Sequence, residues 1–111
     1  MKMIIAVIQP FTLSRLTAEL ECIENFPGLT VGDVRGFGRR IDRSGNRMTS
    51  LDPYKNKVRV EIVTGDEMAE TIVETIKTHA RTGNHGDGKI FVLPVENAVH
   101  IQTGETGNQA I

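Results

Sequence analysis

The order of strand-like and helix-like segments limits the fold of this 111-residue chain more than any other feature. Residues 12–24 and 68–81 have apolar residues at the three-and-four spacing of a buried helix face. Strands are expected on both sides of each helix, over residues 3–9, 29–38, 57–64 and 90–95. This tandem β-α-β order predicts an α+β, ferredoxin-like βαββαβ sandwich with both helices on one face of the sheet. Thr64-Gly65-Asp66-Glu67 fits a capping box before the second helix, residues 99–103 predict a short extra strand, and residues 104–111 form a polar tail.

Composition excludes several classes of protein. Thirteen Lys and Arg residues against 14 Asp and Glu residues give a net charge of −1, which argues against a dedicated nucleic-acid binder. No apolar run approaches the ~18 residues of a transmembrane helix, and the apolar run near the N-terminus is too short for a signal peptide. Cys22 is the only cysteine, so neither an internal disulfide nor a cysteine-based zinc site is expected. We expect one cytoplasmic domain over residues 1–111, without membrane insertion.

The strand residues 3–9 and 90–93 are apolar on both faces. A ferredoxin-like sandwich covers only one sheet face with helices, so a monomer would expose the other apolar face to water. Either a second copy of the chain covers that face, which we favour, or the extra strand and tail do so.

Residues 39–56 are too long and too irregular for a simple connection in a compact domain. The segment contains five cations and two carboxylates, a net charge of +3. We expect a mobile arm that contacts a partner, although a tolerated surface insertion would have the same composition.

Residues Gly83–Lys89 (Gly-Asn-His-Gly-Asp-Gly-Lys) match the first seven positions of a Walker A motif. Ile90 replaces the hydroxyl residue that would bind magnesium, and the segment follows a helix and enters a strand, the reverse of a P-loop. Closely spaced glycines can still turn backbone N–H groups toward one anion, and Lys89 adds a charge. The motif indicates a phosphate-binding loop without catalytic groups, or alternatively a structural glycine turn.

Taken together, these segments resemble the PII signal-transduction proteins. The matching stretches are Thr82–Val92, Gly36–Arg39, Lys57–Val63, Pro10-Phe11 and Thr103–Gly107. The resemblance implies a non-catalytic, ferredoxin-like homotrimer that binds adenine nucleotides (ADP, AMP or ATP) in the clefts between subunits. It also implies that the 39–56 loop docks on a target protein, such as a membrane transporter, an enzyme or a regulator.

The resemblance further implies which residues contact the nucleotide. In the glycine-rich loop, residues 82–89, the expected phosphate contacts are Gly86, Asp87, Gly88 and Lys89. The other expected contacts are Gly28, Thr30 and Val63 at the adenine end, Gly38 and Arg39 at the base of the long loop, and Glu61 near the same cleft.

Two departures from the family pattern bear on the ligand. His100 and Gln102 stand where the family has two arginines aimed at the phosphates, so we expect a shift toward ADP or AMP, or a site tuned by pH through His100. Arg40 stands where the family has a glutamine that helps to hold magnesium with 2-oxoglutarate. A guanidinium does not ligate a metal, which argues against that effector, and Arg40 with Lys57 could instead receive a small anion directly.

The remaining expectations concern the target and metals. Arg43, Arg47 and Tyr54 are candidate target contacts, and Tyr54 does not align with the tyrosine that some members modify, so we expect no uridylylation. A two-histidine metal site of His85 and His100, completed by a neighbouring subunit, is the alternative use of these residues. A metal- or bicarbonate-responsive accessory protein of a transport system, and a small nucleotide hydrolase, remain alternatives to a nucleotide-binding regulator.

Overall fold

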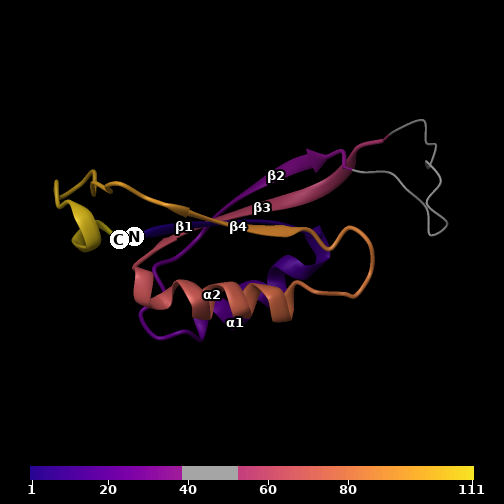
Figure 1. Cartoon of the computed structure of the whole chain (residues 1–111), viewed down its shortest axis with the longest axis horizontal. Helices are drawn as coiled ribbons and strands as arrows, with labels where there is room; N and C mark the ends of the chain where they lie inside the picture. The colour runs from indigo at the N-terminus through magenta and orange to yellow at the C-terminus, as the bar shows by residue number, and fades with distance from the viewer. Residues whose placement is uncertain (39–52) are drawn as a thin grey trace.

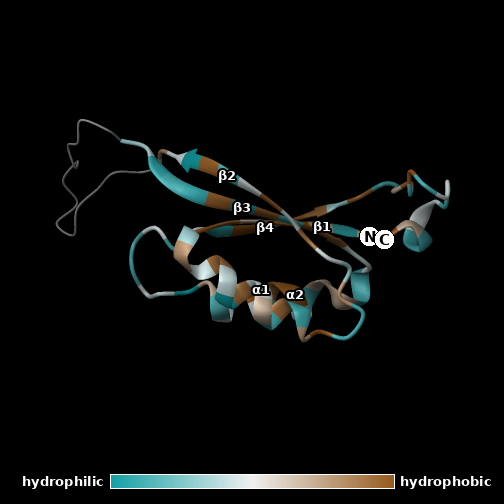
Figure 2. Ribbon diagram, turned by 180° about the vertical axis from the view of Figure 1, so that it is seen from behind, coloured by the Kyte–Doolittle hydropathy of each residue, from teal (hydrophilic) through white to brown (hydrophobic). Residues whose placement is uncertain are grey.

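The computed structural model describes residues 1–38 and 53–111. The elements, shown in Figure 1, are β1 (Lys2–Ile8), η1 (Pro10–Thr12), α1 (Leu13–Glu21), β2 (Thr30–Gly36), β3 (Lys55–Thr64), α2 (Asp66–His79), β4 (Lys89–Pro94) and η2 (Gly107–Ala110). The strands form one four-stranded antiparallel sheet in the order β2-β3-β1-β4. Both helices lie on the same side of this sheet (Figures 1 and 2). The predicted ferredoxin-like α+β fold is confirmed.

The core lies between the helices and the central strands. Every second residue of β1 is buried, and β3 follows the same alternation because the two strands pair residue by residue. The helices contribute residues at the spacing seen in the sequence. The buried apolar set is Ile4, Ala6, Ile8, Leu16, Leu20, Val58, Val60, Ile62, Ile72, Ile76 and Ala80.

The helix ends differ from the sequence prediction. α1 ends at Glu21 rather than at residue 24, because the N–H groups of Cys22 and Ile23 bond to carbonyls three residues back, at 3.2 and 3.0 Å, and tighten the last turn. The predicted capping box before α2 is wrong. Thr64 is the buried last residue of β3, and Gly65 is the N-cap, without a side-chain bond.

The predicted extra strand over residues 99–103 is reduced to a single bridge between Val99 and Thr106. The His100 N–H donates to the Glu105 carbonyl and the Gly104 N–H to the His100 carbonyl, each at 2.8 Å. These bonds close a tight hairpin with Gly104 at φ +75°. The alternation expected for a strand therefore does not apply to His100 and Gln102.

The face of the sheet away from the helices, called here the open face, carries an apolar cluster. The register places Met3 opposite Leu93 and Ile5 opposite Phe91, and Phe91 and Leu93 are 50% and 41% exposed. The C-terminal hairpin lies beyond the end of the sheet rather than over this face (Figure 1). The tail of the chain thus leaves the cluster uncovered. Within residues 1–38 and 53–111 no helix is long and apolar enough to cross a bilayer.

Candidate functional site

Residues 82–88 connect α2 to β4 beside the end of β1, and glycine is essential to their path. Gly83, Gly86 and Gly88 have φ angles of +87°, +89° and +101°. At Gly88 there is also no space for a side chain, because a Cβ would lie 1.6 Å from the Val7 carbonyl oxygen. The left-handed backbone and the close approach to β1 both require glycine at this position.

The Asp87 carboxylate folds the loop back on its own start. One oxygen, Oδ2, accepts the N–H groups of Thr82 and Gly83 at 2.8 Å each, and Oδ1 accepts the Thr82 hydroxyl. The Thr82 hydroxyl in turn accepts the Asn84 N–H at 3.2 Å. The Thr82 hydroxyl and then its N–H hold the pKa of Asp87 below the ordinary value for this carboxyl group. Asp87 is thus an ionised structural acceptor inside the loop.

Lys57 ties the loop to β3. Its Nζ donates a hydrogen bond to the Gly86 carbonyl oxygen. The Gln9 amide lies on the same side, since a Cβ on Gly86 would be 3.0 Å from Gln9 Nε2 and 3.1 Å from Lys57 Nζ. The C=O and N–H of a trans peptide point in opposite directions, so the Asp87 N–H points away from Lys57.

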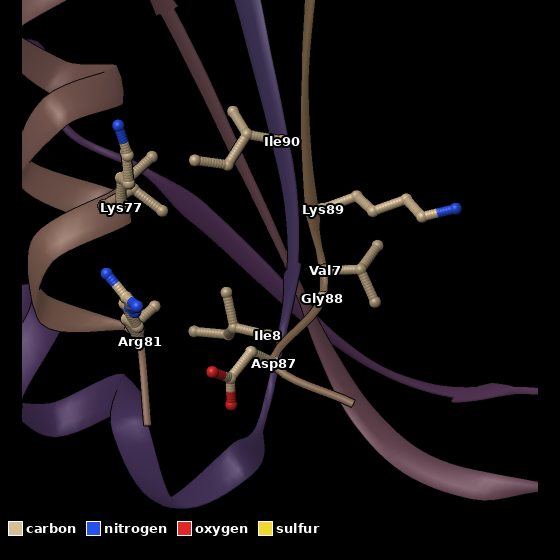
Figure 3. A pocket seen from close by; sticks show the side chains of 10 residues that line it. Val7, Ile8, Lys77, Arg81, Asp87, Gly88, Lys89 and Ile90 are labelled. Carbon is tan, nitrogen blue, oxygen red and sulfur yellow. The ribbon is translucent and has the colours of Figure 1, made fainter. Parts of the chain in front are cut away.

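Asp87 and Lys89 extend to opposite sides of the sheet (Figure 3). Asp87 points to the helix side with Ile8, near Arg81, whereas Lys89 and Val7 point to the other side. A cavity of about 260 Å³ lies behind the loop on the Asp87 side, against the end of α2. The lysine therefore faces the open side without a carboxylate from its own loop.

Three cations line the end of the open face beside this loop. The register places Lys89 opposite Val7 and Val7 opposite Arg59, and Lys57 lies two residues from Arg59 on the same strand. Glu61 offsets one of them, with Oε1 at 2.7 Å from Arg59 Nε. Excess positive charge next to a glycine-rich backbone is chemistry that suits a phosphate or another anion.

Comparison with known proteins shows the family of this chain. The model of the family "Nitrogen regulatory protein P-II" matches residues 1–105.

The chain belongs to the P-II family. It is 41% identical over 116 residues to the nitrogen regulatory protein P-II of Cereibacter sphaeroides and 42% identical over 116 residues to that of Rhizobium meliloti, and both alignments cover all of each chain. It is 41% identical over 108 residues to the P-II homolog of Arabidopsis thaliana, covering 95% of this chain and 55% of the plant protein. The chain thus spans about half the length of that plant relative. Membership places it among signalling regulators.

In this P-II chain the residues expected at the adenine end lie apart from the glycine-rich loop. Thr30 pairs with Glu61 in the register, and Val63 lies two residues further along β3. Gly28, at φ +100°, precedes β2, which forms the edge of the sheet opposite to β4. One chain therefore does not gather Gly28, Thr30 and Lys89 into a single cleft.

His100 and Gln102 also lie away from the loop within a single chain. They lie in the C-terminal hairpin, at the other end of β4 from residues 82–88 (Figure 1). His100 Nδ1 accepts the Thr103 N–H at 3.4 Å. The alternative metal site is therefore not formed within one chain, because His85 belongs to the loop. In the described parts of the chain no three His, Cys, Asp or Glu side chains could hold a metal ion together.

The base of the long loop is described on both sides. Tyr54 packs against Phe37, with ring centroids 5.8 Å apart, and the Arg35 guanidinium lies 5.7 Å from the Tyr54 ring centre. Gly38 is the last described residue before the gap. The predicted contacts Arg39, Arg40, Arg43 and Arg47 lie outside the described residues.

Three residues of the site were not among the sequence-based candidates. Thr82 closes the loop with Asp87, Gln9 lies against Gly86, and Arg59 adds a cation to the open face. The alternation along residues 57–64 places Arg59 on the same strand face as the candidate Glu61, so the sequence pattern could have identified Arg59. The roles of Thr82 and Gln9 arise from loop packing, which no spacing rule describes.

Proposed function

We propose that this P-II protein binds the phosphates of an adenine nucleotide on the Lys89 side of residues 82–88 and controls a target protein through residues 39–56. The observation that carries the proposal is the position of Lys89. Its side chain points away from Asp87, and the ion pairs of the described residues do not include it. Lys89 is exposed to solvent, so its ammonium group is accessible to a phosphate beside the glycine-rich backbone.

The same proposal includes a homotrimer in which each nucleotide lies between two copies. The uncovered cluster of Met3, Ile5, Phe91 and Leu93 supports self-association, because large apolar patches on an isolated chain mark contact surfaces. The separation of Lys89 from Thr30 and from His100 supports a shared site. A second copy can supply the groups that one chain holds too far away.

Within this site we propose that ADP or AMP binds at least as well as ATP. Neither His100 nor Gln102 carries the permanent charge of an arginine, and the loss of two cations weakens a triphosphate more than a less highly charged mono- or diphosphate. The role is regulatory rather than catalytic, with bicarbonate or another small anion as a candidate second effector near Lys57 and Arg40.

Calorimetric titration of the purified protein tests the proposal. ATP, ADP and AMP are each titrated with and without Mg²⁺, 2-oxoglutarate and bicarbonate. We expect binding that Lys89→Ala weakens about tenfold or more, the usual loss when a charged hydrogen-bond partner is removed. Lys77→Ala, an exposed lysine on the helix side, is the matched control and should change nothing.

Two results would contradict the proposal. One is the absence of binding by any of the three nucleotides to the wild-type protein. The other is equal affinity of wild type and Lys89→Ala for the nucleotide, which would show that the phosphates bind away from Lys89. Rapid nucleotide turnover, on the order of 1 s⁻¹ or more, would favour the hydrolase alternative instead.

A further inference from the structure

The loop 82–88 depends on one carboxylate for its shape. Asp87 accepts hydrogen bonds from both N–H groups at the start of the loop and from the Thr82 hydroxyl. These bonds close the loop across five residues. Without them, the glycines at 83 and 86 would allow many other backbone paths.

The Asp87 carboxylate also lies on the helix side of the sheet, away from the Lys89 side where the anion is proposed to bind. In a regular strand, residues two apart share a face, so Asp87 and Lys89 would stand side by side and neutralise one another. Gly88 prevents this, because its φ of +101° turns the chain between them. Asp87 consequently points to the helix side and Lys89 to the open side (Figure 3).

We propose that Asp87 is a positioning residue of the nucleotide site, which holds residues 82–88 in the anion-binding shape without touching the phosphates. This inference rests on the proposed function, since it assumes that the Lys89 side of the loop binds the nucleotide. It differs from the contact role expected for Asp87 from sequence. A carboxylate in contact with phosphate would repel it, whereas a carboxylate bonded to Thr82 and Gly83 organises the donors around it.

The sign of one substitution distinguishes the two roles. Asp87→Asn keeps the size of the side chain and removes its negative charge. It also replaces one of the two acceptor oxygens by an NH₂ group, which donates hydrogen bonds. If Asp87 faced the phosphates, losing the charge would tighten nucleotide binding. If Asp87 positions the loop, ADP binding should weaken by about tenfold, because a smaller fraction of molecules has the loop already folded.

Two variants of Thr82, one without the hydroxyl and one with it, test the same role if Asp87→Asn unfolds the protein. Thr82→Val removes the hydroxyl that Asp87 accepts, and ADP binding should weaken by about threefold to tenfold. Thr82→Ser retains the hydroxyl and should restore wild-type affinity within about twofold. Circular dichroism melting curves would be recorded for each variant, and titrations carried out where all are folded.

A second measurement follows Asp87 directly, without nucleotide. The depressed pKa means that the ionised, loop-closing form is present above the ordinary value of 3.8 and is lost only as the pH falls through a lower value. Carbon NMR titration of the Asp87 carboxyl should show this in wild type and in Thr82→Ser. In Thr82→Val the pKa of Asp87 should rise toward 3.8, because the Thr82 hydroxyl that does most to lower it is gone.

The outcomes separate this inference from the function on which it rests. If wild type binds no nucleotide, the proposed function fails first. If wild type binds ADP and Lys89→Ala abolishes binding while Asp87→Asn and Thr82→Val bind normally, the function stands and the positioning role is overturned. Tighter binding by Asp87→Asn would overturn it as well and would place the carboxylate against the phosphates.

Discussion

At Gly88, a single backbone torsion decides the electrostatics of the site. The residue lies against the Val7 carbonyl, with φ at +101°, and the side chains before and after it leave on opposite sides. The Asp87 carboxylate therefore accepts hydrogen bonds within the loop, and the Lys89 ammonium group faces the other side, where a ligand can reach it. The chemistry of two charged residues is set by a residue that has no side chain.

Gly88→Ala should therefore be more damaging than an ordinary glycine substitution. The new Cβ would overlap the Val7 oxygen and the backbone would be strained, so we expect a loss of about 3 kcal/mol or more in the free energy of unfolding. Gly104→Ala is the matched control, with φ at +75° but no atom within 4 Å of its Cβ, and should cost only about 1 kcal/mol. Urea denaturation measures both, and equal losses would contradict the role given to the close approach.

The glycine spacing predicted either a phosphate-binding loop or a structural glycine turn, and the structure shows a left-handed backbone at Gly83, Gly86 and Gly88. The direction of Asp87 was not predictable, because it depends on the torsion at Gly88 and on the packing of Thr82. Sequence spacing identifies residues that are close in the chain. It does not say on which side of the backbone they emerge.

At the scale of elements, the two helices are joined by a polar contact as well as by the core. The Arg15 guanidinium on α1 donates two hydrogen bonds to the His79 carbonyl at the end of α2, at 2.9 and 2.5 Å. The carbonyls of a helix C-terminus lack partners within the helix, and a cation there also meets the negative end of the helix dipole. Arg15 thus fixes the end of the helix that leads into residues 82–88.

Arg15→Ala should lower the free energy of unfolding by about 1 kcal/mol, the usual net value of such a contact. Lys77→Ala, an exposed cation in the last turn of α2, should cost much less. Thermal and urea unfolding followed by circular dichroism would compare the two variants. A loss no larger for Arg15→Ala than for Lys77→Ala would show that the contact adds nothing to stability.

The existence of each main element was predictable, whereas its ends were not. The apolar patterns of the sequence predicted all four sheet strands and both helices. Burial of one face imposes a two-residue period on a strand and a three-to-four-residue period on a helix. The capping box failed because Thr64 completes β3 and is buried there. The strand expected at residues 99–103 became a hairpin because, within the described chain, no partner strand adjoins it and Gly104 provides the turn.

At the scale of the whole molecule, the open face separates two kinds of surface. Met3, Ile5, Phe91 and Leu93 make its apolar part, and Lys57, Arg59 and Lys89 lie together at the end beside the glycine-rich loop. The sequence predicted the uncovered apolar face because β1 and β4 are apolar on both sides. It did not predict how the cations lie beside that face, which depends on the strand register.

The proposed assembly predicts that Phe91→Glu is a monomer. A carboxylate in the centre of the apolar cluster would lose its hydration on association, at a cost of several kcal/mol per copy. Light scattering after gel filtration should give the mass of one 12.2 kDa chain for this variant and three times that mass for wild type. Phe11→Glu, at a residue 74% exposed in η1, is the control and should leave the proposed trimer intact. A wild-type monomer would refute the proposed assembly.

In the proposed trimer, association through the apolar cluster and nucleotide binding between copies would be linked by mass action. A nucleotide that binds only between copies stabilises the assembled form, and dilution of the protein weakens the apparent affinity for the nucleotide. The concentration of the chain itself would then act as an effector. Abundance as well as ligand level would set how much of this regulator is active.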